Sequence, residues 1–137
     1  MKKVIVDTNI LFSALLDKSK KLRDVLLANA DVTFYTCKFV IVELFKHKER
    51  IRKHSSLEEN EILELLYTFL RKIRIFDEGS VTEESRQQAF DLCKDIDEKD
   101  TPQVAITIEL DGLLWTLDKT LRHGLESKGF HSFFDID

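Results

Sequence analysis

Two aspartates in this sequence each follow a short run of apolar residues, at the point where a buried strand would end. Asp7 comes directly after residues 4–6, and Asp118 closes the segment 113–117. If the two strands are neighbours in one parallel sheet, their carboxyl ends meet at the same edge, which is where ligands bind in such folds. An unpaired carboxylate at the end of an apolar strand is costly to bury, and a bound divalent cation would offset that cost.

Two further acids are candidates for the same site. Asp100 precedes a predicted helix over 101–110, and Glu43 interrupts an apolar run inside a predicted helix over 37–53. Carboxylate oxygens are hard ligands that suit Mg²⁺ or Mn²⁺ better than zinc. Two such ions about 3.5 to 4 Å apart can activate a water and stabilise the leaving oxygen of a phosphodiester. Each acid taken alone is explained as well by a helix cap or a solvated position, so the metal interpretation depends on the joint pattern.

The elements that would position these acids alternate between strands and helices. Ser56 followed by Glu59 resembles a capping box, and Thr101-Pro102 is typical of an N-cap and the first helical residue. We expect strands at 3–7, 32–35, 73–76, 113–117 and 132–134, and helices at 10–16, 20–30, 37–53, 56–72, 82–96, 101–110 and 119–128. This alternation predicts an α/β fold with a parallel sheet of about four to five short strands flanked by helices.

Composition limits the remaining choices. A length of 137 residues with one proline and four glycines predicts a single domain over 1–137, without a flexible linker. The net charge of −4 argues against a protein that coats nucleic acid by bulk electrostatics, but it leaves room for a nuclease with an acidic pocket. The sequence shows neither a signal peptide nor an apolar span, so we expect no membrane association. Its two cysteines suit neither a disulfide scaffold nor a zinc ribbon, and we expect a cytoplasmic protein.

Four short segments, in order along residues 6–119, resemble the motifs of the PIN-domain family. They are Val6-Asp7-Thr8-Asn9-Ile10-Leu11, Glu43-Leu44, Asp100-Thr101-Pro102-Gln103-Val104-Ala105 and Trp115-Thr116-Leu117-Asp118-Lys119. The resemblance implies a PIN-like three-layer sandwich and an endoribonuclease, a hydrolase that cleaves RNA with Mg²⁺ or Mn²⁺. Many small members of the family resemble VapC-type toxins, so the expected partners are an RNA substrate and an antitoxin protein. We also expect a homodimer.

The resemblance also implies roles for individual residues. The catalytic, metal-binding cluster would comprise Asp7, Glu43, Asp100 and Asp118. Thr8 and Asn9 would support Asp7 through hydrogen bonds, and Thr116 would help to shape the pocket. Asp97, three residues before Asp100, is the alternative third acid; Asp100 is preferred because it directly opens the helix and matches the motif.

Two surface features have more than one interpretation, and there are two alternatives to a nuclease function. The basic run 46–54, with Arg50, Arg52 and Lys53, is either a solvated helix end or an RNA-binding ridge that contacts phosphates. Apolar side chains between residues 63 and 70 form part of the core, or they bury against a second subunit or an antitoxin. The alternative to an enzyme is a non-catalytic PIN-fold module that binds nucleic acid or protein. A phosphatase of the aspartyl-phosphate type is disfavoured, because Asp7-Thr8-Asn9 lacks the second acid that such a motif needs.

Overall fold

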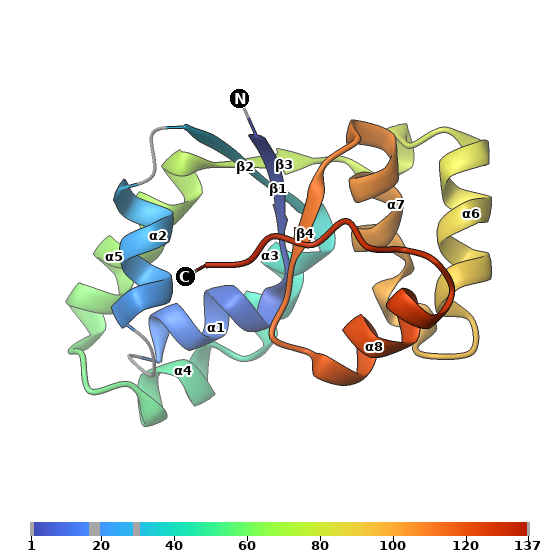
Figure 1. Ribbon diagram of the computed structural model, residues 1–137. Helices are drawn as coiled ribbons and strands as arrows, with labels where there is room; N and C mark the ends of the chain where they lie inside the picture. Colours follow the sequence, from blue (N-terminus) through green and yellow to red (C-terminus); the bar gives the residue numbers. More distant parts are fainter. Residues whose placement is uncertain (1, 17–19, 29–30, 137) are drawn as a thin grey trace.

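A parallel four-stranded sheet lies at the centre of the protein, in a computed structural model that describes residues 2–16, 20–28 and 31–136. Helices cover both faces of the sheet, with α1, α2 and α5 on one side and α6 and α7 on the other (Figure 1). The elements are β1 (Lys2–Val6), α1 (Thr8–Leu15), α2 (Lys20–Ala28), β2 (Val32–Cys37), α3 (Lys38–Lys46), α4 (Lys48–His54), α5 (Glu59–Lys72), β3 (Ile73–Phe76), η1 (Glu78–Ser80), α6 (Glu83–Cys93), η2 (Glu98–Asp100), α7 (Thr101–Leu110), β4 (Leu113–Trp115) and α8 (Lys119–Ser127).

The strand order is β3-β2-β1-β4, and every neighbouring pair is parallel. Strand β1 is central because its last three residues, Val4, Ile5 and Val6, are apolar on both faces and fully buried. From β1 the chain proceeds outward through β2 and β3, then returns across the sheet to place β4 on the other side of β1. The junction of β1 and β4 is therefore the point where the strand order reverses, and ligands bind at this point in open α/β sheets.

Helix α7 delivers β4 to its place beside β1. The helix ends at Asp111, whose backbone is left-handed (φ 50°), and Gly112 follows. A side chain at Gly112 would meet the carbonyl oxygen of Lys3 at 2.8 Å, so only glycine lets the chain approach β1 this closely. The predicted boundaries of this helix, 101–110, are confirmed.

Several predicted elements differ from the structure. The strand expected over 113–117 ends at Trp115, so that Asp118 lies beyond the strand and does not close it. The helix expected over 37–53 is two helices, because the backbone of His47 (φ −108°, ψ 16°) leaves the helical region between α3 and α4. The capping box of α5 is formed by Glu58 and Glu61 rather than by Ser56 and Glu59. In place of a last strand over 132–134, the part of the chain that the structure describes has one isolated bridge between Leu114 and Phe133. Residues 29 and 30 of the second predicted helix lie outside the described residues.

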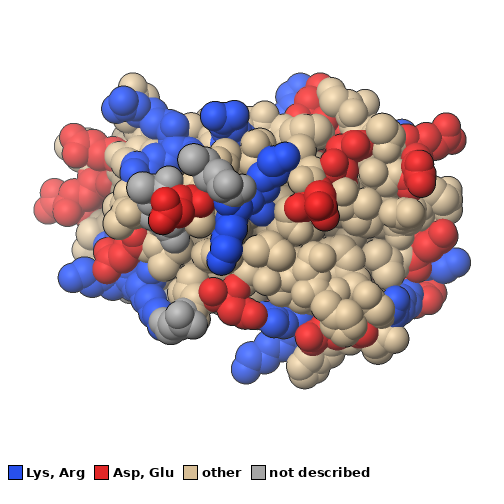
Figure 2. Space-filling view, turned by 45° about the horizontal axis from the view of Figure 1, so that its top comes forward, with Lys and Arg blue, Asp and Glu red and all other residues tan. Residues whose placement is uncertain are grey.

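The charged side chains at the surface are of mixed sign. On the face that includes the amino ends of the strands, acidic and basic groups are interspersed around broad uncharged areas (Figure 2). This face is therefore not strongly basic, in keeping with the net charge of −4. Within residues 2–16, 20–28 and 31–136, no helix is both long enough and apolar enough to cross a bilayer.

Candidate functional site

Asp7 lies at the carboxyl end of β1, where the strand order reverses. Its backbone N–H donates to the carbonyl oxygen of Trp115 at 3.0 Å, which carries the β1–β4 pairing to the last residue of β4. Its side chain caps α1 and is only 8% exposed. The central strand and the helix that follows it therefore hold this carboxylate between them, at the carboxyl edge of the sheet.

Both oxygens of the Asp7 carboxylate accept hydrogen bonds. Oδ1 accepts from the backbone N–H of Thr8 at 2.7 Å. Oδ2 accepts from the hydroxyl of Thr116 at 2.8 Å and from the side-chain amide of Asn9 at 3.2 Å. The Asn9 amide oxygen in turn accepts from the N–H of Leu117 at 3.0 Å, which ties the start of α1 to the segment after β4. This network fixes the orientation of the carboxylate.

Glu43 and Asp118 are joined to the same network. Glu43 is half-buried on α3, and its Oε1 accepts from the hydroxyl of Thr8 at 3.2 Å. The backbone N–H of Asp118 donates to the Thr116 hydroxyl at 3.1 Å, and its exposed carboxylate caps α8 by accepting from the N–H of Leu121 at 3.0 Å. The structure therefore brings Glu43 and Asp118 to Asp7 through the hydroxyls of Thr8 and Thr116, respectively.

The two candidates for the third acid differ in their local bonding. Asp97 is exposed, and its side chain caps η2 by accepting from the N–H of Lys99 at 3.0 Å. Asp100 is half-buried at the start of α7, and its side chain makes no capping hydrogen bond. The carboxylate of Asp97 thus caps a helix, whereas the carboxylate of Asp100 caps none.

The pKa values of Asp7 and Asp100 are raised by burial and by the acids around them. Burial raises the pKa of Asp7, and the nearby charges of Asp118 and Glu43 add to the effect, although hydrogen bonds from Thr116 and Thr8 oppose it. Burial raises the pKa of Asp100 to about 7, with repulsion from Asp7, Asp97, Asp118 and Glu43 acting in the same direction. The four acids singled out from the sequence, with Asp97, therefore share one region of negative potential.

A hard divalent cation matches this site in donor chemistry. The side chains offer carboxylate oxygens, and a cation among them would relieve the repulsion that, after burial, raises the pKa of Asp100. In the described ranges, however, no three His, Cys, Asp or Glu side chains already stand close enough to hold one ion together. The residues fit Mg²⁺ or Mn²⁺ by kind and charge, and the carboxylates would have to adjust their rotamers to bind it.

Two polar residues that the sequence analysis did not single out are buried beside Asp7. Thr36 of β2 and Gln103 of α7 both donate to the carbonyl oxygen of Val6, at 2.8 and 3.1 Å. A signal for Gln103 exists in the sequence, since it is a polar residue directly before the apolar run 104–106 of a buried helix. Thr36 carries no comparable signal, because threonine is common in strands.

The predicted RNA-contacting residues Arg50, Arg52 and Lys53 lie exposed on α4. The guanidinium of Arg52 pairs with Glu49 at 3.3 Å and with Glu59 of α5 at 3.8 Å. These two ion pairs partly neutralise Arg52, so that Arg50 and Lys53 are the better candidates for phosphate contacts.

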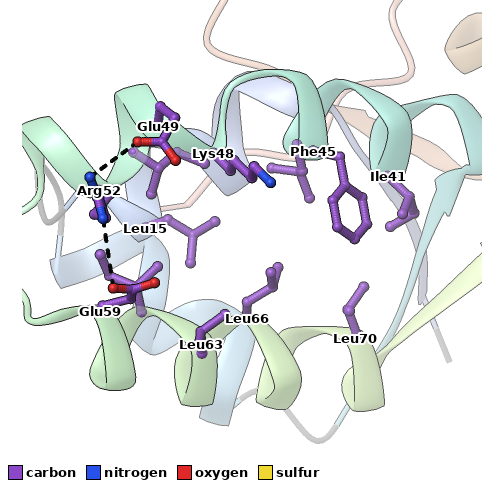
Figure 3. Close-up of a pocket in the computed structure, with 13 residues that line it drawn as sticks. Leu15, Ile41, Phe45, Lys48, Glu49, Arg52, Glu59, Leu63, Leu66 and Leu70 are labelled. Atoms are coloured by element: carbon purple, nitrogen blue, oxygen red, sulfur yellow. Dashed lines mark ion pairs between the residues drawn. The ribbon is translucent and has the colours of Figure 1, made fainter.

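A separate apolar groove lies between α3–α4 and α5 (Figure 3). Phe45 is 68% exposed on one side, and Leu63 is 56% exposed on the other. Arg52 and its two acidic partners close one end, and the opposite end lies between Ile41 and Leu70. The predicted apolar face of α5 is thus only partly core, because just Ile62 and Phe69 of this helix are buried.

Comparison with known proteins identifies the family. The family model described as PIN domain matches residues 5–133, which is nearly the whole chain. Among solved structures, the chain is similar to VapBC2 from Rickettsia felis bound to a DNA fragment from its promoter, with 16% sequence identity, a TM-score of 0.66, and 88% of this chain and 92% of the other covered. No curated protein matches the chain. The α/β fold expected from the sequence is confirmed, and the chain belongs to the PIN-domain family.

Proposed function

We propose that this protein is an endoribonuclease that hydrolyses RNA phosphodiesters with Mg²⁺ or Mn²⁺. The observation that supports the proposal is that Glu43 and Asp118 are linked to Asp7 at the switch point of the sheet through the hydroxyls of Thr8 and Thr116. Burial, together with repulsion from these acids, raises the pKa of Asp100 to about 7. A phosphodiester is anionic, so bare carboxylates would repel it, and they serve cleavage only with cations between them and the phosphate.

Asp7, Glu43, Asp100 and Asp118 would hold the cation. The ion supplies an activated water and neutralises charge on the phosphate when it is bound. The chain's own task is to orient the ligands: Thr116, Asn9 and the Thr8 N–H direct Asp7, and the Thr8 hydroxyl directs Glu43. Because Asp100 must lose its proton to act as a ligand, cation binding should tighten as the pH rises through about 7.

A cleavage assay tests the proposal. We expect a labelled RNA to be cut in the presence of Mg²⁺ or Mn²⁺, and cleavage to stop on addition of a chelator and return with excess metal. The alternative is a PIN-fold module that binds nucleic acid or protein without cleaving. RNA that is retained by the protein but stays intact at every metal concentration would favour this alternative.

The exposed cations of α4 lead to a second prediction. Replacing Arg50 and Lys53 together with alanine should weaken RNA binding and reduce the slope of log K against log salt by about 1 to 2, because each lost phosphate contact releases fewer counterions. Arg52→Ala should change the slope less, since Glu49 and Glu59 already pair with this guanidinium. Binding of a labelled RNA from 50 to 300 mM salt, with chelator present to prevent cleavage, measures the effect; an unchanged slope would show that α4 is only a solvated helix.

We propose in addition that the groove between α3–α4 and α5 receives an apolar helix of an antitoxin protein. The similar structure from Rickettsia felis is of VapBC2, and an exposed groove lined by leucine, isoleucine and phenylalanine suits the apolar face of an amphipathic helix. Glu43 lies on α3 between two residues that line the groove, Ile41 and Phe45, so that an occupant would lie along the helix that carries one of the acids.

A charged side chain placed in the groove should weaken the binding of an antitoxin helix. Leu63→Glu is expected to weaken binding of the antitoxin protein by at least about tenfold, since an apolar contact would become a buried, unpaired carboxylate. Phe90→Glu is the control, because Phe90 is also exposed on a helix but lies outside the groove. Calorimetric titration measures both affinities, and sedimentation of the isolated chain tests whether a second copy, as in the predicted homodimer, occupies the groove instead.

A further inference from the structure

The carbonyl group of Val6 ends the central strand, and side chains bind it where the backbone ladder stops. The pairing of β1 with β2 ends at Ile5 and Tyr35. One residue further on, the hydroxyl of Thr36 donates to the Val6 carbonyl oxygen at 2.8 Å, and the Nε2 of Gln103 donates to the same oxygen at 3.1 Å. Side chains from β2 and α7 thus converge on the last peptide group before Asp7.

Burying the side-chain amide of Gln103 destabilises the protein unless its Nε2 donor has a structural role. Thr36 is 1% exposed and Gln103 is 5% exposed. The Oε1 of Gln103 is buried and accepts no hydrogen bond from the residues that the structure describes. A buried acceptor without a partner destabilises a protein, and an apolar side chain of similar size would avoid that cost. The amide therefore has a structural use only through its donor, and that donor points at Val6.

The two residues joined by this amide each adjoin an acid. Val6 directly precedes Asp7, and Gln103 lies in the first turn of α7, which begins directly after Asp100. The carboxylates of Asp7 and Asp100 repel each other, so the two elements that carry them need an attachment close to the acids. The bond from Gln103 to Val6 supplies one between α7 and β1, and the bond from Thr36 fixes the same carbonyl to β2.

We propose that Gln103 and Thr36 are positioning residues, which set the spacing of Asp7 and Asp100 and thereby the affinity of the site for a divalent cation. The inference rests on the proposed function, because it takes these acids as cation ligands. Neither residue would touch the ion. Both act through the Val6 carbonyl, as outer groups that orient metal ligands do in other sites, where their loss costs about 10- to 100-fold in affinity or activity.

The experiment compares donors of similar size. Gln103→Met and Thr36→Val each remove one donor with little change of volume, whereas Thr36→Ser keeps the hydroxyl. Ile106→Val is the control, since it shortens a fully buried apolar side chain on the same helix. The readouts are the dissociation constant for Mn²⁺ of the purified full chain, from electron paramagnetic resonance without RNA, and the Mn²⁺ concentration that gives half-maximal RNA cleavage.

We expect Gln103→Met and Thr36→Val to bind Mn²⁺ about tenfold more weakly than the native chain, with Thr36→Ser and Ile106→Val close to native. Excess Mn²⁺ should restore cleavage in both weakened variants, because their ligands are intact. Native affinity in Gln103→Met and Thr36→Val, or an equal loss in Ile106→Val, would overturn the positioning role. If the native protein binds Mn²⁺ but leaves RNA intact, the proposed nuclease activity is refuted, and the Mn²⁺ affinities of the variants still test the positioning role. If the native protein binds no Mn²⁺, both proposals are refuted.

Discussion

Asp7→Asn should reduce the rate of RNA cleavage by about a hundred- to a thousandfold. The substitution keeps the size of the side chain but removes one negative ligand, and a loss of about 3 to 4 kcal/mol of transition-state stabilisation corresponds to that factor. The substitution also disturbs the hydrogen bonds that the Asp7 carboxylate accepts, which adds to the loss. Both carboxylate oxygens of Asp7 accept, whereas asparagine would turn an NH₂ group toward the N–H of Thr8 or toward the amide of Asn9. Cleavage of a labelled RNA across a series of Mn²⁺ concentrations measures the loss.

Matched substitutions make this result specific. Asp118→Asn should be less damaging, because Asp118 is exposed and water can partly replace its oxygen. Asp100→Asn should be severe and Asp97→Asn mild, since the Asp97 side chain already caps η2. Unfolding curves confirm that each variant is folded. Near-native cleavage by Asp7→Asn would refute the mechanism, and equal damage at 97 and 100 would show that both acids take part.

Predictions of the elements succeeded where a local pattern decides the structure. The β-branched, wholly apolar run before Asp7 is the buried strand expected from the sequence. Helix α7 starts where Thr101-Pro102 indicated to within one residue, because its N-cap is Asp100 and Thr101 is already helical. The predictions failed where no local pattern marks the structure. The break at His47 follows no proline or glycine. The His47 ring packs edge to face against Phe12 of α1, with the ring centroids 5.6 Å apart, and the sequence of α3–α4 does not reveal this neighbour.

In the candidate site, too, the sequence indicated some features and only the fold shows the others. Family motifs in the sequence indicated Asp7, Glu43, Asp100 and Asp118, and the structure places them within electrostatic range of one another. The bonds that hold them are beyond sequence reasoning. That Thr8 directs its hydroxyl to Glu43 depends on the packing of α1 against α3, and the use of Gln103 depends on how α7 crosses the end of β1. Residues that carry chemistry can thus be identified from type and order, whereas those that position them require the fold.

The raised pKa of Asp100 has a consequence for stability, with a sign opposite to that of most aspartates. In the unfolded chain this carboxyl titrates near 3.8, and in the folded protein its pKa is about 7. Well below pH 3.8 it is protonated in both states and makes no difference. Between pH 4 and 7 the folded state keeps a proton that the unfolded state has lost, so stability falls as the pH rises. Above pH 7 the group is ionised in both states, and the destabilisation has reached its full extent.

Asp100→Asn should therefore stabilise the metal-free protein at pH 8 by about 1 to 3 kcal/mol, with solvent screening of this half-buried group taken into account, and leave it nearly unchanged at pH 4. The substitution sacrifices no helix cap, because the side chain of Asp100 makes no capping bond. Urea unfolding with chelator at both pH values measures the difference, and Asp97→Asn, at an exposed site, is the control. Added Mn²⁺ should reverse the order at pH 8, since the native chain gains a ligand-bound state that the variant binds less well. If the variant is no more stable than the native chain at pH 8 without metal, burial and the neighbouring acids do not destabilise the ionised Asp100 carboxylate as the structure indicates.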